Sequence, residues 1–497
     1  MRKELFIELL KELCNVCFLT ELSEITDGLS RRVIADRALD LTNEEIEDVL
    51  NTEDLKIKAI KLYLHTYSEE LDDKVKKLIE DNVNNNVSYV MPLIGYFKSS
   101  GRKDVYEFMK AILDREDEYM IASLSEIIRN DNIYVRDDAL DLLNIALSAK
   151  EEYQIDFVKE AIDCEDLLKR EDAFEFIKLI VSAKSNFHAE HLCEMATDPD
   201  LLKREDALEF LKLVSEAKEK YQIEYAVSLA TDSDTLEKRD AIDYLKLILD
   251  ADTEYHAEYA SYILEDTEAL NRKDVMDLAK VIMNTKATFQ AEYASDVARD
   301  SRVLQKENAL DFVNVVAKAK KSYLAEYASL AATNKSIIEH SKALDIVKII
   351  VSTEKDYQSE YTYKVAKKAV LYNRDKALEI IKKVSKTEEK YQAKCIDILT
   401  NVTNLLRKEE ILGYIDEVIN AKNEDKALRT VKRIIRKNKG KEEKLVEKKC
   451  LEVIEQEKMV GDLVKEKSFI DLINIVNNQD IEEINSKTIV KVKTIKK

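Results

Sequence analysis

Apolar residues along most of this chain recur at spacings of three and four, the pattern of helices with one buried face. In "ALEFLKLVSEAK" the stripe includes Ala207, Leu211 and Val214. In the following "YQIEYAVSLA" a shorter stripe includes Tyr225 and Leu229. A short polar stretch separates the two segments. The pattern predicts two antiparallel helices joined by a tight connection.

This hairpin recurs at a constant step of 34 residues. An alanine-type position keeps the step without insertion at Val105, Ala139, Ala173, Ala207, Ala241, Val275, Ala309, Ala343 and Ala377. An aromatic position keeps it at Tyr119, Tyr153, Phe187, Tyr221, Tyr255, Phe289, Tyr323, Tyr357 and Tyr391. Two columns in register over nine units indicate a true structural repeat. A worn tenth copy begins near Ile411.

Successive hairpins are separated by residues suited to a helix N-cap, namely Asp198, Asp232, Asp266, Asp300 and Asn334. One hairpin cannot bury its apolar faces alone, so neighbouring copies must stack. A column of small residues lets the helices approach closely: Ala149, Ala183, Ala217, Ala251, Thr285, Ala319, Thr353 and Thr387. The sequence predicts an all-α fold, a right-handed-type α-solenoid of stacked antiparallel helix pairs with atypical helical caps at both ends.

Three regions are expected along the chain. Residues 1–100 form an N-terminal helical cap of degenerate repeats, with a capping-box pattern from Thr42 to Glu45. Residues 101–402 contain nine repeats, and residues 403–497 contain the worn tenth repeat and a basic helical cap. For the last twelve residues, "SKTIVKVKTIKK", a loose end and a short β segment both stay open.

A 34-residue helical hairpin resembles the tetratricopeptide repeat superfamily, over roughly Arg102 to Leu412. The resemblance is one of architecture only. The chain has no Trp, and Pro199 is the only Pro or Gly between Arg102 and Leu412, so the superfamily's sequence signature is absent. The resemblance implies the stacked architecture and the general role of such stacks as binding platforms. No binding residue is carried over from it.

The amino-acid composition argues against some folds and some kinds of binding. With 6 Gly and 2 Pro in 497 residues, a β-rich fold would lack turn residues. The net charge of -20 disfavours nonspecific binding to nucleic acid or to an anionic membrane. Six scattered cysteines and an opening segment interrupted by charges, which is typical of an amphipathic helix rather than a leader or membrane span, predict a reduced, cytoplasmic protein.

Few residues suggest a catalytic or metal-binding role. Cys14 and Cys17 have the spacing of half a zinc site, but a structural zinc needs two further ligands, so two buried cysteines on one helix are expected. His188, His191 and Cys193 share a helix, in columns that elsewhere hold amides and aromatics, so they are expected to pack or to form hydrogen bonds. No glycine-rich phosphate loop and no catalytic triad stand out. We expect no enzyme activity, no cofactor and no metal.

Repeated exposed residues are the remaining candidates. One column contains Glu190, Glu224, Glu258, Glu292, Glu326 and Glu360, and the next contains Tyr225, Tyr259, Tyr293, Tyr327 and Tyr361. Two interpretations stay open. The columns either line an acidic, tyrosine-containing groove for a basic peptide or surface, or they are solvated carboxylates and tyrosines packed between hairpins. The aromatic column containing Tyr221 is expected in the core.

The function expected from the sequence is a non-catalytic protein-binding scaffold that uses this acidic face. The alternative is an acidic nucleic-acid mimic that occupies a basic site on a nuclease or another nucleic-acid enzyme. The basic segment from Lys426 to Lys449 offers a third hypothesis, direct contact with nucleic acid. For that segment, a solvated face or pairing with the chain's own acidic middle is the simpler interpretation.

Overall fold

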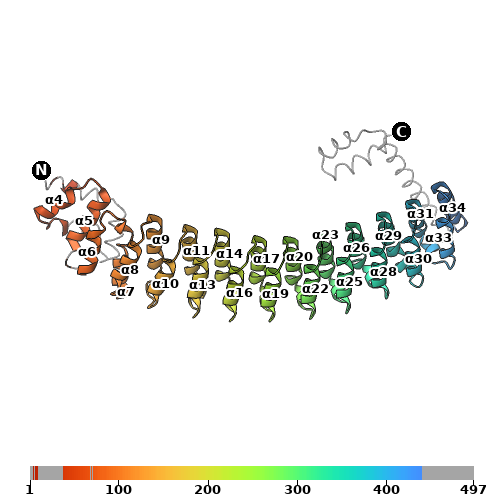
Figure 1. The fold of residues 1–497 in the computed structure, drawn as a ribbon, viewed down its shortest axis with the longest axis horizontal. Coiled ribbons are helices and arrows are strands. Elements are labelled where there is room, and N and C mark those ends of the chain that lie inside the picture. The colour runs from red at the N-terminus through yellow and green to blue at the C-terminus, as the bar shows by residue number, and fades with distance from the viewer. Residues whose placement is uncertain (1–3, 5, 9–36, 68, 70, 439–497) are drawn as a thin grey trace, which may run out of the picture. The chain divides into compact units, whose positions relative to one another are not determined.

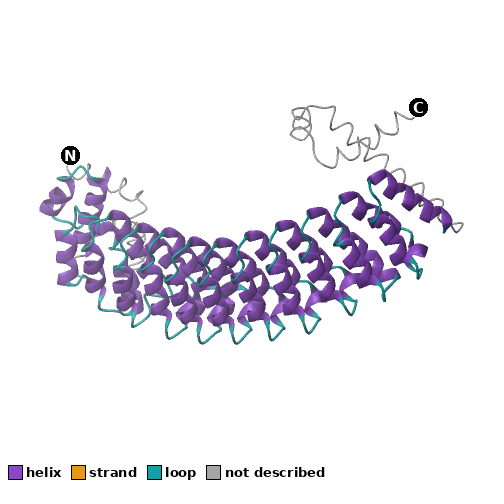
Figure 2. Ribbon diagram, turned by 45° about the vertical axis from the view of Figure 1, so that its right-hand side comes forward, coloured by secondary structure: helices purple, strands orange, loops and turns teal. Residues whose placement is uncertain are grey.

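The fold is known from a computed structural model, which describes residues 4, 6–8, 37–67, 69 and 71–438. The chain divides into two compact units, Met1–Asn284 and Thr285–Lys497. The boundary lies inside the repeated region. The described residues contain helices and turns but no strand, and consecutive helices pack on one another in chain order in each unit (Figures 1 and 2). The all-α solenoid is therefore confirmed, while the three-region division stays a prediction.

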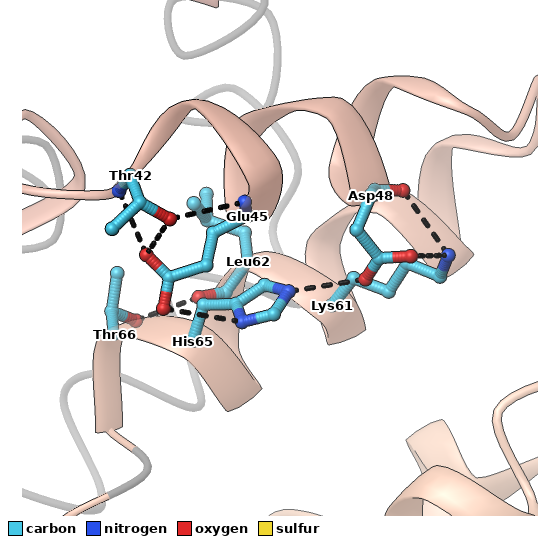
Figure 3. Close-up of polar contacts among 7 residues, drawn as sticks. All are labelled: Thr42, Glu45, Asp48, Lys61, Leu62, His65 and Thr66. Atoms are coloured by element: carbon cyan, nitrogen blue, oxygen red, sulfur yellow. Dashed lines mark hydrogen bonds and ion pairs between the residues drawn. The ribbon is translucent and has the colours of Figure 1, made fainter.

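The first unit opens with helices outside the 34-residue register, whose bounds are α4 (Asn43–Leu50), α5 (Leu55–Tyr67), α6 (Asp73–Asp81), the 3₁₀ helix η1 (Val87–Tyr89) and α7 (Leu93–Ser100). The predicted capping box is present: Thr42 Oγ1 accepts from the Glu45 N–H, and Glu45 Oε2 accepts from the Thr42 N–H at 2.7 Å (Figure 3). Asp48 then joins α4 to α5 by accepting from Lys61 Nζ at 2.6 Å and contacting His65 Nε2 at 3.0 Å.

The repeats of the first unit follow. Their first helices are α8 (Val105–Leu113), α10 (Ala139–Ala146), α13 (Ala173–Val181), α16 (Ala207–Ser215), α19 (Ala241–Leu249) and α22 (Val275–Met283). Their second helices are α9 (Glu118–Arg129), α11 (Glu152–Ile162), α14 (Asn186–Thr197), α17 (Lys220–Thr231) and α20 (Glu254–Leu264). Second helices pack on second helices from α9 to α20, and first helices pack on first helices from α10 to α19, while α22 packs mainly on α20. Ala207 and Ala241 are both buried, as the stacking hypothesis requires.

The second unit continues the pattern. Its first helices are α25 (Ala309–Ala317), α28 (Ala343–Val351), α30 (Ala377–Val384) and α33 (Ile411–Ile419). Its second helices are α23 (Thr288–Ala298), α26 (Ser322–Ala332), α29 (Asp356–Tyr372), α31 (Lys390–Thr400) and α34 (Glu424–Lys437). The worn tenth repeat is thus a helix pair, α33 and α34, and Ile411 is buried.

The prediction of two helices per repeat is incomplete. Most repeats carry a third, one-turn helix: α12 (Glu165–Leu168), α15 (Pro199–Leu202), α18 (Ser233–Leu236), α21 (Thr267–Leu270), α24 (Ser301–Leu304), α27 (Lys335–Ile338) and α32 (Thr403–Leu406). The Asp and Asn column caps five of these short helices; the Asp198 carboxylate, for example, accepts from the Leu201 N–H at 2.7 Å. Four residues are too few to show a helical period, so only the cap was visible in the sequence.

Candidate functional site

The two predicted columns share one face of the second helices, which we call the Glu–Tyr ladder. In the first unit the ladder includes Glu190 on α14, Glu224 and Tyr225 on α17, and Glu258 and Tyr259 on α20. Glu190 and Glu224 are exposed. Glu258 is partly covered and accepts a hydrogen bond from the Tyr262 hydroxyl at 3.0 Å.

In the second unit the ladder lies on three further helices: Glu292 and Tyr293 on α23, Glu326 and Tyr327 on α26, and Glu360 and Tyr361 on α29. Glu292 is exposed, and Glu326 and Glu360 are partly covered. Glu360 differs from the others because it pairs with Lys364 one turn further along the same helix. In Figure 1 these helices form one edge of the unit.

The ladder tyrosines lie between successive repeats. Tyr225 and Tyr327 are half-buried, and Tyr361 is buried. Burial, followed by the charge of Glu258 in the next repeat, raises the pKa of Tyr225 to about 12. Burial and then Glu360 raise the pKa of Tyr327 to about 12 in the same way. Each of these two phenols is therefore a neutral hydrogen-bond donor beside a carboxylate of the following repeat.

Much of the ladder's negative charge is not neutralised by the protein. Among the residues that the structure describes, the carboxylates of Glu190, Glu224, Glu292 and Glu326 have no ion-pair or hydrogen-bond partner. The two interpretations of these columns, an acidic groove and tyrosines packed between hairpins, therefore each describe part of the site. In each unit the tyrosines lie at the joints between repeats, and the unpaired carboxylates lie on the same side of the second helices: Glu190 and Glu224 in the first unit, Glu292 and Glu326 in the second.

The structure contains a second repeated arrangement of side chains, which the sequence analysis did not predict. Arg170 donates to both oxygens of Asp172, at 2.8 and 2.9 Å, and to the backbone carbonyls of Leu202 and Arg204 in the next repeat, at 2.6 and 3.0 Å. The guanidinium also lies over the Phe176 ring, 5.2 Å from its centroid. We call this arrangement the arginine clamp. It bridges two repeats and satisfies carbonyls at the end of a short helix.

The clamp recurs in register in the first unit, where Asp accepts from Arg two residues earlier at Arg102, Arg136, Arg170, Arg204 and Arg272. The guanidinium lowers the pKa of Asp104, Asp138, Asp172 and Asp274. The signal was present in the sequence as Arg-x-Asp repeated every 34 residues. It was hidden because an isolated Arg-x-Asp is common on charged surfaces.

The aromatic column containing Tyr221 was wrongly expected in the core. Tyr153 and Tyr221 are half-buried, and their hydroxyls donate to Ala183 O at 3.3 Å and Ala251 O at 3.1 Å. The neighbouring Gln154 reaches Ala183 O as well, at 3.0 Å. These side chains cap the carbonyl end of the next repeat's first helix, which needs a polar group at the edge rather than an apolar one inside.

The histidines have the packing role expected for them. His188 takes the place of the glutamine, with Nε2 3.3 Å from Ala217 O and Nδ1 3.0 Å from Ser185 Oγ. His191 contacts Glu194 at 3.0 Å and stacks edge-on against Phe187. Burial raises the pKa of the Cys193 thiol to about 12, which keeps it protonated and weakly reactive. In the described part of the chain, no cluster of three or more His, Cys, Asp or Glu side chains is arranged to hold a metal.

Cys14 and Cys17, like the last twelve residues, lie outside the described residues. Of the basic segment, the part up to Lys437 is described and belongs to α34. This helix buries Ala427, Val431, Ile434 and Ile435 and exposes Arg429, Lys432, Arg433, Arg436 and Lys437. The predicted helical spacing of the cations is confirmed there, whereas contact with nucleic acid stays a prediction.

None of the described helices combines the length and the apolarity needed to span a bilayer. No protein-family model matches the chain, and no curated protein matches it either.

Proposed function

We propose that the chain is a non-catalytic scaffold that binds another protein through the Glu–Tyr ladder. The partner presents a basic surface or a basic peptide. The observation that carries the proposal is the set of carboxylates without ion-pair partners, of which Glu224, Glu292 and Glu326 are each followed directly by a half-buried tyrosine. Repulsion among such carboxylates is relieved when cations approach, and complementary charge speeds and orients association. Tyrosine adds rigid contact area and a hydroxyl donor.

The spacing of the ladder favours a protein partner over mimicry of nucleic acid. Packed helices lie about 8–10 Å apart, so each ladder offers about one carboxylate per 8–10 Å. A nucleic-acid strand presents a phosphate about every 3.4 Å of helix axis. A basic site shaped for phosphates would meet too few charges on the ladder, whereas the lysines and arginines of a folded surface or extended peptide need no such density.

The general use of tetratricopeptide-like stacks as binding platforms supports the same proposal. We also propose a cytoplasmic setting for it. Cys164, Cys193 and Cys395 are free thiols, which suits a reducing compartment.

The test reverses the ladder charge in the first unit with Glu190→Lys, Glu224→Lys and Glu258→Lys together. Proteins captured by the wild-type chain are identified by mass spectrometry, and the most enriched basic protein is purified. Its affinity for both chains is then measured by calorimetry at two salt concentrations. We expect the affinity to fall at least tenfold in the variant and to fall with salt for the wild type.

A matched control applies the same change of charge to the first-helix face, with Asp141→Lys, Glu175→Lys and Glu209→Lys. These three exposed positions are also 34 residues apart. The control is expected to bind like the wild type. Equal loss in both variants would mean that net charge matters and the ladder does not. Unchanged binding in the ladder variant would refute the proposal.

A further inference from the structure

One joint of the first unit differs from its neighbours on the first-helix side. The clamp position of the repeat that contains α19 holds Lys238 instead of arginine. Lys238 Nζ donates to Asn271 Oδ1 at 3.2 Å and makes no ion pair with a described residue, so Asp240 is left without a clamp partner. An ammonium group lacks the planar fork that lets arginine hold a carboxylate and two carbonyls at once.

A hollow of about 380 Å³ lies at this joint, between α19 and the start of α22. Other joints of the unit have hollows of about 450 and 570 Å³, so this hollow is distinguished by its lining and not by its size. Lys238 and Tyr244 line it from one repeat, and Asn271 and Lys273 line it from the next.

Tyr244 is a polar residue in an apolar column. The same position holds Phe176, Phe210 and Phe312 in other repeats. Tyr244 is only 5% exposed, and its hydroxyl has no hydrogen-bond partner among the described residues. Burial, followed by Asp240 and Asp243, raises the pKa of Tyr244, so the phenol stays protonated near neutral pH. The hydroxyl is thus a donor that only water or a ligand can use.

The lining is locally cationic on an acidic protein. Four lining residues carry positive charge and two carry negative charge: Lys238, Arg239, Arg272 and Lys273 against Asp240 and Asp243. Arg272 is held by Asp274 at 2.7 Å, but Arg239 and Lys273 are exposed and have no ion-pair partner in the described residues. By contrast, the hollow between α10 and α13 is lined by four carboxylates and one lysine.

We propose that this joint binds the phosphate group of a small phosphorylated molecule. Lys238 and Lys273 supply positive charge from two successive repeats, Arg239 adds a guanidinium at the rim, and the Tyr244 hydroxyl donates a hydrogen bond from the buried side. Charge-assisted hydrogen bonds from several cations are the usual means of holding a phosphate.

The experiment titrates the full chain with inorganic phosphate and follows binding by calorimetry, with acetate at equal ionic strength as the carboxylate probe. Two substitutions restore residues that the chain itself uses at equivalent positions, Lys238→Arg and Tyr244→Phe. Lys238→Arg rebuilds a clamp to Asp240 and fills the hollow, so phosphate affinity should fall at least tenfold. Tyr244→Phe removes one hydrogen bond, which lowers affinity about fivefold.

The matched control is Lys203→Arg, an exposed lysine paired with Asp200, which should leave phosphate affinity unchanged. Unchanged circular dichroism and melting temperature verify that each variant is folded. The proposal is overturned if phosphate shows no saturable binding at millimolar concentration. It is overturned equally if acetate binds as tightly as phosphate, or if both Lys238→Arg and Tyr244→Phe bind phosphate like the wild type.

Discussion

The repeats of the two units have the same 34-residue period, but different side chains connect one repeat to the next. In the first unit the clamp position holds arginine at four successive repeats, and the partner position holds Asp104, Asp138, Asp172 and Asp206. In the second unit the clamp position holds Lys306, His340, Arg374 and Lys408, and the partner position holds Asn308, Lys342, Lys376 and Glu410. The carboxylate two residues after a guanidinium is therefore lost.

His340 keeps one of the contacts that the clamp makes across the joint. Its Nε2 lies 3.2 Å from Arg374 O, the carbonyl 34 residues further on, and its Nδ1 accepts from the Lys342 N–H at 3.0 Å. Arg170 reaches the equivalent carbonyl, Arg204 O. The tautomer with its proton on Nε2 satisfies both contacts of His340. His340 thus keeps a contact across the joint without the ion pair that Arg170 forms with Asp172 in the first unit.

The largest effect is expected from the core, where the two units should respond alike. Phe176 and Phe312 occupy the same column and are buried in their units. Truncating either to alanine should lower the local free energy of opening by about 3–5 kcal/mol, because a large cavity is left. Phe176→Ala also removes the ring under Arg170, which adds about 0.5–1 kcal/mol. Hydrogen exchange of α13 and α25 measures the two losses.

The next effect separates the units. Arg170→Ala leaves two carbonyls and the Asp172 carboxylate without their donor, and should cost about 2 kcal/mol. His340→Ala removes one contact across the joint and should cost about 1 kcal/mol. Hydrogen exchange of the flanking helices reports both values.

Lys169→Ala is the control for the clamp, since Lys169 is exposed and pairs only with nearby carboxylates on its own short helix. Its effect on stability should be much smaller than that of either clamp variant, because exposed ion pairs contribute little. If Arg170→Ala and His340→Ala lower the free energy of opening by the same amount, the ion pair adds no stability to the joints of the first unit.

The smallest effect is a dependence on pH that belongs to the first unit. Arg170 lowers the pKa of Asp172 below its value in the unfolded chain, about 3.9. The pair therefore stabilises the folded chain above about pH 4. This stabilisation is lost as the pH falls through the lowered pKa of Asp172 in the folded chain. Asp172→Asn should destabilise the chain by about 1 kcal/mol at pH 7 and make little difference at pH 3.

Urea unfolding followed by circular dichroism at the two pH values gives this difference. Asp345→Asn, at an exposed position of α28 without an ion-pair partner in the described residues, should have no effect at either pH. An Asp172→Asn penalty that persists at pH 3 would show that the amide disturbs packing and that charge is not its cause.

Periodic features were readable from the sequence because each repeat imposes the same local environment. The alanine column through Ala207, the cap at Asp198 and the hairpin pattern all follow from contacts within one repeat or with an identical neighbour. The Glu–Tyr ladder was readable for the same reason, since residues 34 apart must lie on one face of the stack.

Only the tertiary structure decided which of these columns face a joint and which face solvent. Tyr221 and Tyr225 are both aromatic and both periodic, yet the first caps a carbonyl of the next repeat and the second lies beside its carboxylate. The clamp of Arg170 and the hollow beside Lys238 also depend on groups more than thirty residues away. The sequence alone determined the period, because that depends on local spacing; the joints required the structure, because their geometry arises where one repeat meets the next.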